Sequence, residues 1–172
     1  MSKLCRSLLI VLVGIAAVMR ITACGDAKES VEPQVGIANP FVDYDTLQDA
    51  CDAIGFGMDA PETIGEYNGV TFSVMKASEM IQIHYRKDEN HYVVIRKART
   101  QESIDGDYNL YEEDKTEEID GREVRLKGNA GNVSLATWSD GEFSYSIGAY
   151  DLAEDGTGLS AKEMKDIISQ VK

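Results

Sequence analysis

Hydrophobic and polar residues alternate with a period of two along three consecutive segments in the middle of the chain. The pattern starts at Val70, Phe72 and Val74 and returns over 81–85 and 91–95, with polar breaks between the segments. Successive side chains of a β-strand point to opposite faces, so this alternation is typical of strands that bury one face. We therefore expect three antiparallel strands joined by hairpins.

Three further strands are expected later in the chain, over 123–127, 133–139 and 142–150. Asp140-Gly141 lies between the last two and predicts a two-residue hairpin turn, because a type I′ turn needs positive φ at both central residues. Apolar and small polar residues alternate along the last strand. This alternation predicts a sheet with one dry side.

A helical period appears at both ends of this region. Residues 45–46 supply a cap for a short helix that runs to Ile54 and stops at Gly55. A second helix opens at Ser160, which forms a capping box with Glu163. The apolar positions of this helix recur at helical spacing and are Met164, Ile167, Ile168 and Val171. We expect it to pack across the dry side of the sheet.

The polar segment 100–118 separates the two groups of strands. We expect it to be a loop with room for one short edge strand. The chain over 41–172 is therefore predicted to form a single α+β domain. In this domain an antiparallel sheet of about six or seven strands lies between an N-terminal and a C-terminal helix.

The first residues have the three parts of a bacterial secretion signal. Lys3 and Arg6 precede an apolar run over 8–19, and small residues follow over 21–23. The run is shorter than the roughly 20 residues that a membrane-spanning helix needs, but it suits a signal peptide. We assign 1–23 to the signal peptide. An uncleaved signal anchor and an ordinary secretory signal are the alternatives.

Ile21-Thr22-Ala23-Cys24 resembles the lipobox of bacterial lipoproteins. The resemblance implies that the Cys24 thiol receives a diacylglycerol and that cleavage just before it leaves Cys24 as the first mature residue. Fatty acyl chains such as palmitate would then hold the protein at the extracytoplasmic face of the cell membrane. Residues 24–40 read as the lipidated cysteine and a flexible tether, with a reach on the order of 20 Å.

Charge and cysteine content narrow the functional classes. The chain has 17 Lys and Arg against 30 Asp and Glu, a net charge of −13. Nucleic acid is therefore excluded as a partner, because binding phosphates needs a basic surface. Anionic lipid headgroups repel such a chain, so we expect the domain to be held off the bilayer. Cys51 falls on the apolar stripe of the first helix and reads as a small buried residue rather than a catalytic thiol.

No motif assigns a catalytic residue or a cofactor. The chain has no G-x-S-x-G sequence, Walker loop or Rossmann glycine pattern. His84 and His91 are weak metal candidates, because a two-residue turn at Lys87-Asp88 would place them opposite one another across a hairpin. Spacing fixes no third ligand, so we assign no metal site.

Aromatic residues are the remaining candidates for binding. Tyr and Trp are favoured at recognition surfaces, because they bury much area at little entropic cost. Trp138, Tyr85 and Tyr145 are our candidates, and core packing is the alternative reading of Trp138. The full set of candidates comprises Tyr67, Tyr85, Tyr92, Tyr108, Tyr111, Trp138, Tyr145 and Tyr150.

A second resemblance covers about residues 45–171. It rests on short motifs, which are Thr46-Leu47, Ala53-Ile54-Gly55-Phe56, Pro61, Ile81-Gln82-Ile83-His84-Tyr85, Ile119-Asp120-Gly121, Ala136-Thr137-Trp138 and the segment from Tyr145 to Ile147. These resemble uncharacterised extracytoplasmic domains of Firmicutes lipoproteins and of some anti-sigma-factor-like membrane proteins. The resemblance implies a sensor, adaptor or binding role and supplies no catalytic residue.

Three functions follow for comparison with the structure. The first is a non-enzymatic surface lipoprotein that binds an unknown protein or small ligand at the cell envelope, which predicts a filled core and an exposed aromatic patch. The second is a carrier with a large apolar cavity between helix and sheet for a lipid or acyl chain. The third is an envelope hydrolase, which predicts two nearby carboxylates in a cleft with a shifted pKa.

Overall fold

The computed structural model describes residues 39–152 and 158–172. The predicted signal peptide, Cys24 and most of the predicted tether lie outside the described residues. Within the described ranges, no helix is long and apolar enough to cross a membrane.

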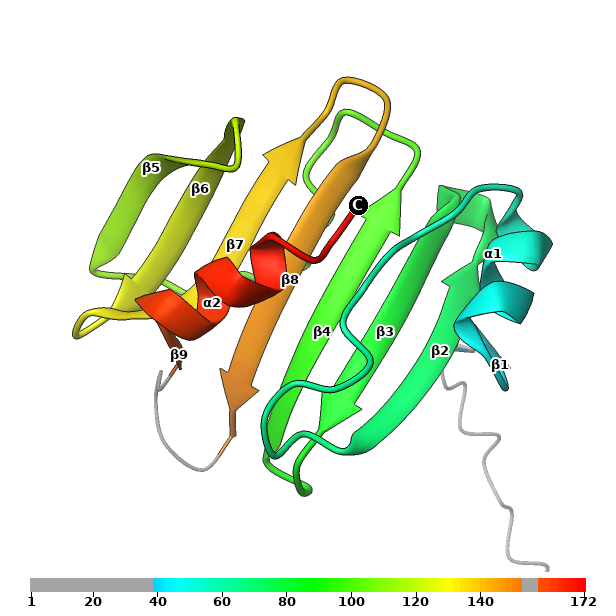
Figure 1. Cartoon of the computed structure of the whole chain (residues 1–172), viewed down its shortest axis with the longest axis horizontal. Helices are drawn as coiled ribbons and strands as arrows, with labels where there is room; N and C mark the ends of the chain where they lie inside the picture. Colours follow the sequence, from blue (N-terminus) through cyan, green and yellow to red (C-terminus); the bar gives the residue numbers. More distant parts are fainter. Residues whose placement is uncertain (1–38, 153–157) are drawn as a thin grey trace, which may run out of the picture. The chain divides into compact units, whose positions relative to one another are not determined.

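One antiparallel sheet organises the described chain (Figure 1). Eight strands follow the order β1-β2-β3-β4-β8-β7-β6-β5, and β9 pairs with β7 beside this path. The strands are β1 (Val42–Tyr44), β2 (Gly69–Met75), β3 (Met80–Arg86), β4 (His91–Ala98), β5 (Glu113–Ile119), β6 (Arg122–Asn129), β7 (Asn132–Ser139), β8 (Ser144–Asp151) and β9 (Leu159–Ser160). The strands β4 and β8 pair in the middle and join the two groups of strands predicted from the sequence.

Two α-helices and one short 3-10 helix complete the described fold, which confirms the α+β class. These are α1 (Leu47–Ile54), η1 (Lys76–Ser78) and α2 (Ala161–Ile168). Thr46 caps α1, and Gly55 ends it with φ of 87°. Ser160 and Glu163 form the predicted capping box at the start of α2. The strand β1 comes before α1, so the first element is not a helix.

The strand count is higher than the six or seven expected from the sequence. The strands β1 and β9 have three and two residues, too few for a period to appear. The strand β5 corresponds to the short edge strand expected within 100–118, although the charged residues of its sequence EDKTEEI hide the alternation. It lies at the edge of the sheet, where charged side chains protect an exposed strand from pairing with other chains.

The hairpin at Asp140-Gly141 is wider than predicted. The last pair is Ser139 with Ser144, so the loop spans 140–143. The Asp140 carboxylate accepts hydrogen bonds from the backbone N–H groups of Glu142 and Phe143, and it stabilises this wider loop in place of a two-residue turn. A two-residue turn with positive φ at both positions occurs instead at Asp120-Gly121, which joins β5 to β6.

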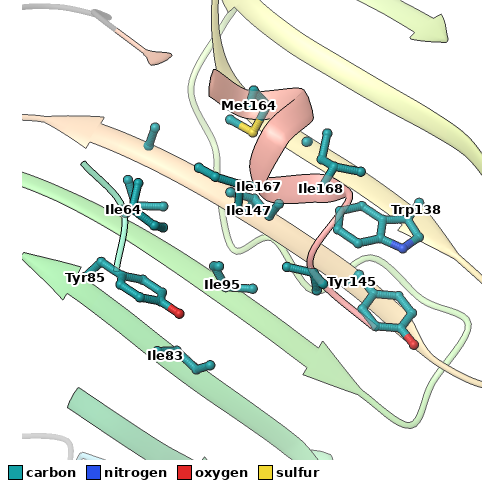
Figure 2. Close-up of a cluster of buried hydrophobic side chains, with 14 of the residues drawn as sticks. Ile64, Ile83, Tyr85, Ile95, Trp138, Tyr145, Ile147, Met164, Ile167 and Ile168 are labelled. Carbon is teal, nitrogen blue, oxygen red and sulfur yellow. The ribbon is translucent and has the colours of Figure 1, made fainter. Parts of the chain in front are cut away.

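The main hydrophobic core lies between the sheet and the two helices. Figure 2 shows Met164, Ile167 and Ile168 of α2 packed over Ile147 of β8. The strands β3 and β4 supply the centre of this core with alternate apolar residues, as their sequence pattern predicts. Their fully buried members are Ile81, Ile83, Tyr85, Val93 and Ile95. We call this side the helix-covered face.

The opposite side of the sheet is also covered, contrary to the prediction of a single dry side. The segment between β4 and β5 runs behind the sheet, on the side away from α2 (Figure 1). Its Ile104 packs against Met80 and Ala98. Ser144 is buried beneath this segment, and its hydroxyl donates to the Thr100 carbonyl at 2.9 Å. A long segment with one buried apolar residue gives no periodic signal, so the sequence pattern did not reveal this second layer. We call this side the loop-covered face.

Candidate functional site

Two of the three predicted aromatic residues meet on the helix-covered face. Trp138 of β7 pairs with Tyr145 of β8, so their rings stack with centroids 5.1 Å apart and planes 3° from parallel. Figure 2 shows the two rings side by side at one end of the core. Their residues are only 6% and 4% exposed. The core-packing reading of Trp138 is therefore correct, and the pair forms a floor rather than an exposed patch.

Tyr85 does not join this pair. It lies at the other end of the core in Figure 2 and is 1% exposed. Its hydroxyl donates to the Pro61 carbonyl at 2.6 Å, and burial raises the pKa of its phenol. Prediction of Tyr85 as a surface binding residue is wrong, because its strand position points it beneath the segment that contains Pro61.

A lysine that sequence reasoning missed lies beside the stacked pair. Lys97 of β4 is 7% exposed, and its Nζ donates to the Gly57 carbonyl at 2.7 Å. The same Nζ lies 4.5 Å from the ring centroid of Phe143 and 5.4 Å from that of Tyr145. Burial lowers the pKa of the ammonium. In the sequence, Lys97 follows Val93 and Ile95 at the next alternate position of the strand. A lysine at a position that should face the core is the signal that could have identified this residue.

An arginine covers the other half of the pair. The guanidinium of Arg122 in β6 lies 5.5 Å from the centroid of the Trp138 ring. It donates to the carbonyls of Val171 at 2.8 Å and Ile168 at 3.0 Å. The last carbonyls of a helix lack partners within the helix, so Arg122 satisfies that of Ile168 at the end of α2. Its second bond, to Val171 just beyond the helix, also holds this end of the chain against the sheet.

The carboxylates around the pair have partners of their own. Asp140 accepts a hydrogen bond from the Tyr145 hydroxyl at 2.8 Å. Burial of Asp140 acts in the opposite sense, yet this bond and the Phe143 N–H hold the pKa of its carboxyl below the ordinary value. Asp120 lies 3.7 Å from Arg122, and Glu142 lies 3.7 Å from Arg99.

These groups surround an open groove of about 870 Å³. It is lined by Lys97, Asp120, Arg122, Trp138, Asp140, Glu142, Phe143, Tyr145, Ser169 and Lys172. We call it the cation-aromatic groove. Its aromatic floor favours flat apolar groups, and its ammonium and guanidinium groups favour negative charge. The arrangement suits a ligand that carries both an apolar ring and a negative charge.

The two histidines lie on opposite faces of the sheet. The loop between β3 and β4 spans 87–90 instead of Lys87-Asp88 alone, so His84 pairs with Val94 rather than with His91. His91 Nδ1 lies 2.7 Å from the Asp88 carboxylate. The hypothesis that both histidines hold one ion is therefore wrong. No group of three potential metal ligands occurs within 39–152 and 158–172.

Cys51 takes the structural place predicted for it. It is 8% exposed on α1, carries a free thiol, and burial raises its pKa. A raised pKa keeps the thiol protonated, which disfavours a catalytic role.

Comparisons of the chain with family models, curated proteins and solved structures found no match.

Proposed function

We propose that the protein is a non-enzymatic, membrane-anchored binding domain at the cell envelope. Its ligand is a small amphipathic anion that occupies the cation-aromatic groove. The observation that carries this proposal is Lys97, a buried ammonium held between aromatic rings at the wall of an open groove. A protein retains a buried charge at a cost of several kcal/mol, on the order of the desolvation penalty, so a role for that charge is expected.

The charges favour an anion over a cation. Each groove carboxylate already faces a cation or accepts hydrogen bonds from the hairpin. Lys97 makes a single hydrogen bond to a neutral carbonyl. An anionic group placed near its Nζ would gain a charge-assisted hydrogen bond, and an apolar ring of the same ligand would lie along Phe143. The chain is strongly acidic overall, but three basic residues line the groove, Lys97, Arg122 and Lys172, and they supply local positive charge for an anion.

The carrier function has less support than the binding function. Between α2 and the sheet, Met164 and Ile168 are fully buried and fill the space where an acyl chain would lie. The carrier function predicts a large apolar cavity in this layer, between helix and sheet. The groove lies instead at the end of α2 and has charged residues in its wall.

The hydrolase function has less support for an electrostatic reason. A general acid needs a raised pKa to hold its proton near neutral pH. Hydrogen bonds from basic side chains instead lower the pKa of four further described carboxyl groups, Glu66, Asp88, Asp114 and Glu117. Asp140 in the groove shifts in the same direction.

The anchoring half of the proposal rests on the lipobox resemblance at Cys24. Acylation there would place the domain at the extracytoplasmic face with a tether between lipid and fold. The test replaces Cys24 by Ala in the full chain and follows fractionation and intact mass. We expect the variant to leave the membrane fraction or to stay unprocessed. Normal cleavage with full membrane retention would contradict the anchor.

Trp138 is the single tryptophan of the chain, so its emission reports directly on the groove. The probe is 8-anilinonaphthalene-1-sulfonate, an aromatic anion that accepts energy from tryptophan. We expect saturable quenching of Trp138, with affinity at least about tenfold weaker in Lys97→Met, since a hydrogen bond to a charged group is lost. Lys162→Met is the matched control, because Lys162 is exposed on α2. Thermal unfolding of each variant checks that it folds.

Equal affinity in Lys97→Met and the wild type would overturn the groove as the anion site. The second probe is cis-parinaric acid, which carries an acyl chain. Saturable binding of this probe that ignores both Lys97→Met and competition by the sulfonate would favour the carrier function instead.

A further inference from the structure

Two large apolar side chains stand almost free in solvent on the loop-covered face. Tyr108 and Leu110 are each 96% exposed. They belong to residues 105–111, which we call the tyrosine turn. Single exposed apolar residues are common on soluble proteins, but two on one turn form a small apolar prominence. Leu152, which is 65% exposed, lies with Leu110 beside a hollow of about 370 Å³ and extends this surface.

The tyrosine turn is held in shape by its own aspartates. Asp107 accepts a hydrogen bond from the Asn109 N–H at 2.8 Å and a second from the Tyr111 hydroxyl. Asp105 accepts one from the Asp107 N–H at 3.0 Å. These bonds span Tyr108 and Leu110 from both sides, so the exposed side chains sit on an ordered backbone.

Both ends of the tyrosine turn are also bonded to the sheet. The guanidinium of Arg96 in β4 donates to the carbonyls of Ile104 and Asp105. At the other end, the Glu112 N–H donates to the Asn129 side chain at 2.8 Å. An ordered surface loses little conformational entropy on binding, so a display of this kind favours association.

The charge around the turn selects the kind of partner. From 100 to 114 the chain has six acidic residues and no Lys or Arg, and the acids are Glu102, Asp105, Asp107, Glu112, Glu113 and Asp114. Arg125 pairs with Asp114, and the Arg96 guanidinium at the start of the turn offsets a second negative charge. The remaining field repels anionic lipid headgroups and repels the same turn of a second copy. It attracts a surface that carries Lys and Arg.

We propose that the tyrosine turn docks a second protein, in an apolar pocket of that partner that receives Tyr108 and Leu110 and is bordered by basic residues. This surface goes beyond the proposed anion site, because it lies on the opposite face of the sheet from the cation-aromatic groove. A domain with a ligand groove on one face and a partner surface on the other has the layout that a sensor or adaptor needs.

The test places the photo-cross-linking residue p-benzoylphenylalanine at position 108 of the full chain, in cells that process it. Position 42 is the matched control, since Val42 is exposed and apolar on β1, at the other end of the strand order. We expect one discrete heterologous protein adduct at 108 and none of the same mass at 42. Mass spectrometry of the cross-linked segment should find Lys or Arg beside the attachment site.

A second variant separates specific docking from chance proximity. Leu110→Ser should lower the adduct yield about tenfold, the effect expected when one leucine contact is lost. Thermal unfolding should change little, because Leu110 is 96% exposed. Washing membranes with 1 M salt before irradiation should also reduce the adduct yield. At this salt concentration the screening length is about 3 Å, so the attraction between the acidic turn and a basic partner surface is largely lost.

Four outcomes would overturn the docking proposal. They are no adduct at 108, an adduct with a second copy of this chain, an adduct with lipid, and a partner segment that is acidic at the attachment site. Sulfonate binding at the groove is unaffected by every one of them, so failure here leaves the proposed function standing.

Discussion

The two faces of the sheet are covered by different chemistry. On the helix-covered face, Met164 and Ile168 of α2 pack on Ile147 within a large apolar cluster. On the loop-covered face, Arg96 donates to Gln82 and to two carbonyls of the loop, and the loop contributes Ile104 to a small apolar cluster with Met80 and Ala98. The helix layer is held by apolar packing, as in a domain core, whereas the loop layer is held mainly by hydrogen bonds. We infer that the helix layer sets the stability of the domain and that the loop layer sets what the domain displays.

The largest expected effect comes from a cavity in the helix layer. Ile168 is fully buried, so Ile168→Ala should destabilise the domain by about 2–5 kcal/mol. Ile104→Ala removes the same atoms from the loop-covered face, where the site can collapse toward solvent, and should cost about 1–2 kcal/mol. Urea unfolding followed by Trp138 emission measures both. Equal losses in the free energy of unfolding would contradict the inference that the helix layer sets the stability of the domain.

A smaller effect is expected from the polar network that holds the loop. Arg96→Met leaves the carbonyls of Ile104 and Asp105 without their donor, which should cost about 1–3 kcal/mol. Amide hydrogen exchange should accelerate over 103–111 and stay slow in the neighbouring strands. Arg125→Met is the control, because Arg125 forms an exposed pair with Asp114 worth about 0–1 kcal/mol. Faster exchange throughout the sheet would show that Arg96 supports the whole domain rather than the loop.

Much of the helix-covered face could be predicted from the sequence. Periodicity and capping chemistry are local signals, so Thr46, Gly55 and Ser160 marked the ends of α1 and the start of α2 correctly. The alternation of Ile81 and Ile83 likewise identified β3 and its buried side. These predictions succeeded because the residues that decide each element lie within a few positions of one another.

The loop-covered face and the groove depend on contacts between distant residues. Arg122 reaches the carbonyl of Val171, and Lys97 reaches that of Gly57, across 49 and 40 positions. Nothing in the local sequence fixes either bond. Trp138 and Tyr145 were selected by residue type alone, and their pairing follows from the register between β7 and β8. The sequence predicts a two-residue turn between β7 and β8, but the loop spans 140–143, so the register of this pair could not be predicted.

The smallest effect separates the two faces by proton binding, because each carries one histidine. On the loop-covered face, burial lowers the pKa of His84, and nearby Arg96 and Arg86 add to this. At the edge of the helix-covered face, the hydrogen bond with Asp88 raises the pKa of His91, although partial burial opposes it. NMR titration of the imidazole ring protons should therefore show His91 gaining its proton first as the pH falls. Asp88→Asn should bring the His91 pKa down and leave that of His84 unchanged.

The two shifts affect stability with opposite signs. Protonated His91 is favoured in the folded state, so its contribution is complete below the unfolded pKa of about 6.5 and is lost as the pH rises through its higher folded value. Protonated His84 is disfavoured in the folded state, so it costs stability as the pH falls below about 6.5. On acidification from pH 7 to 5.5, the His91 contribution should therefore raise the midpoint of urea unfolding and the His84 contribution should lower it. In Asp88→Asn the stabilising contribution of His91 is weakened, so the same acidification should lower the midpoint of urea unfolding. A midpoint that rises in that variant would show that the assignment of the two signs is reversed.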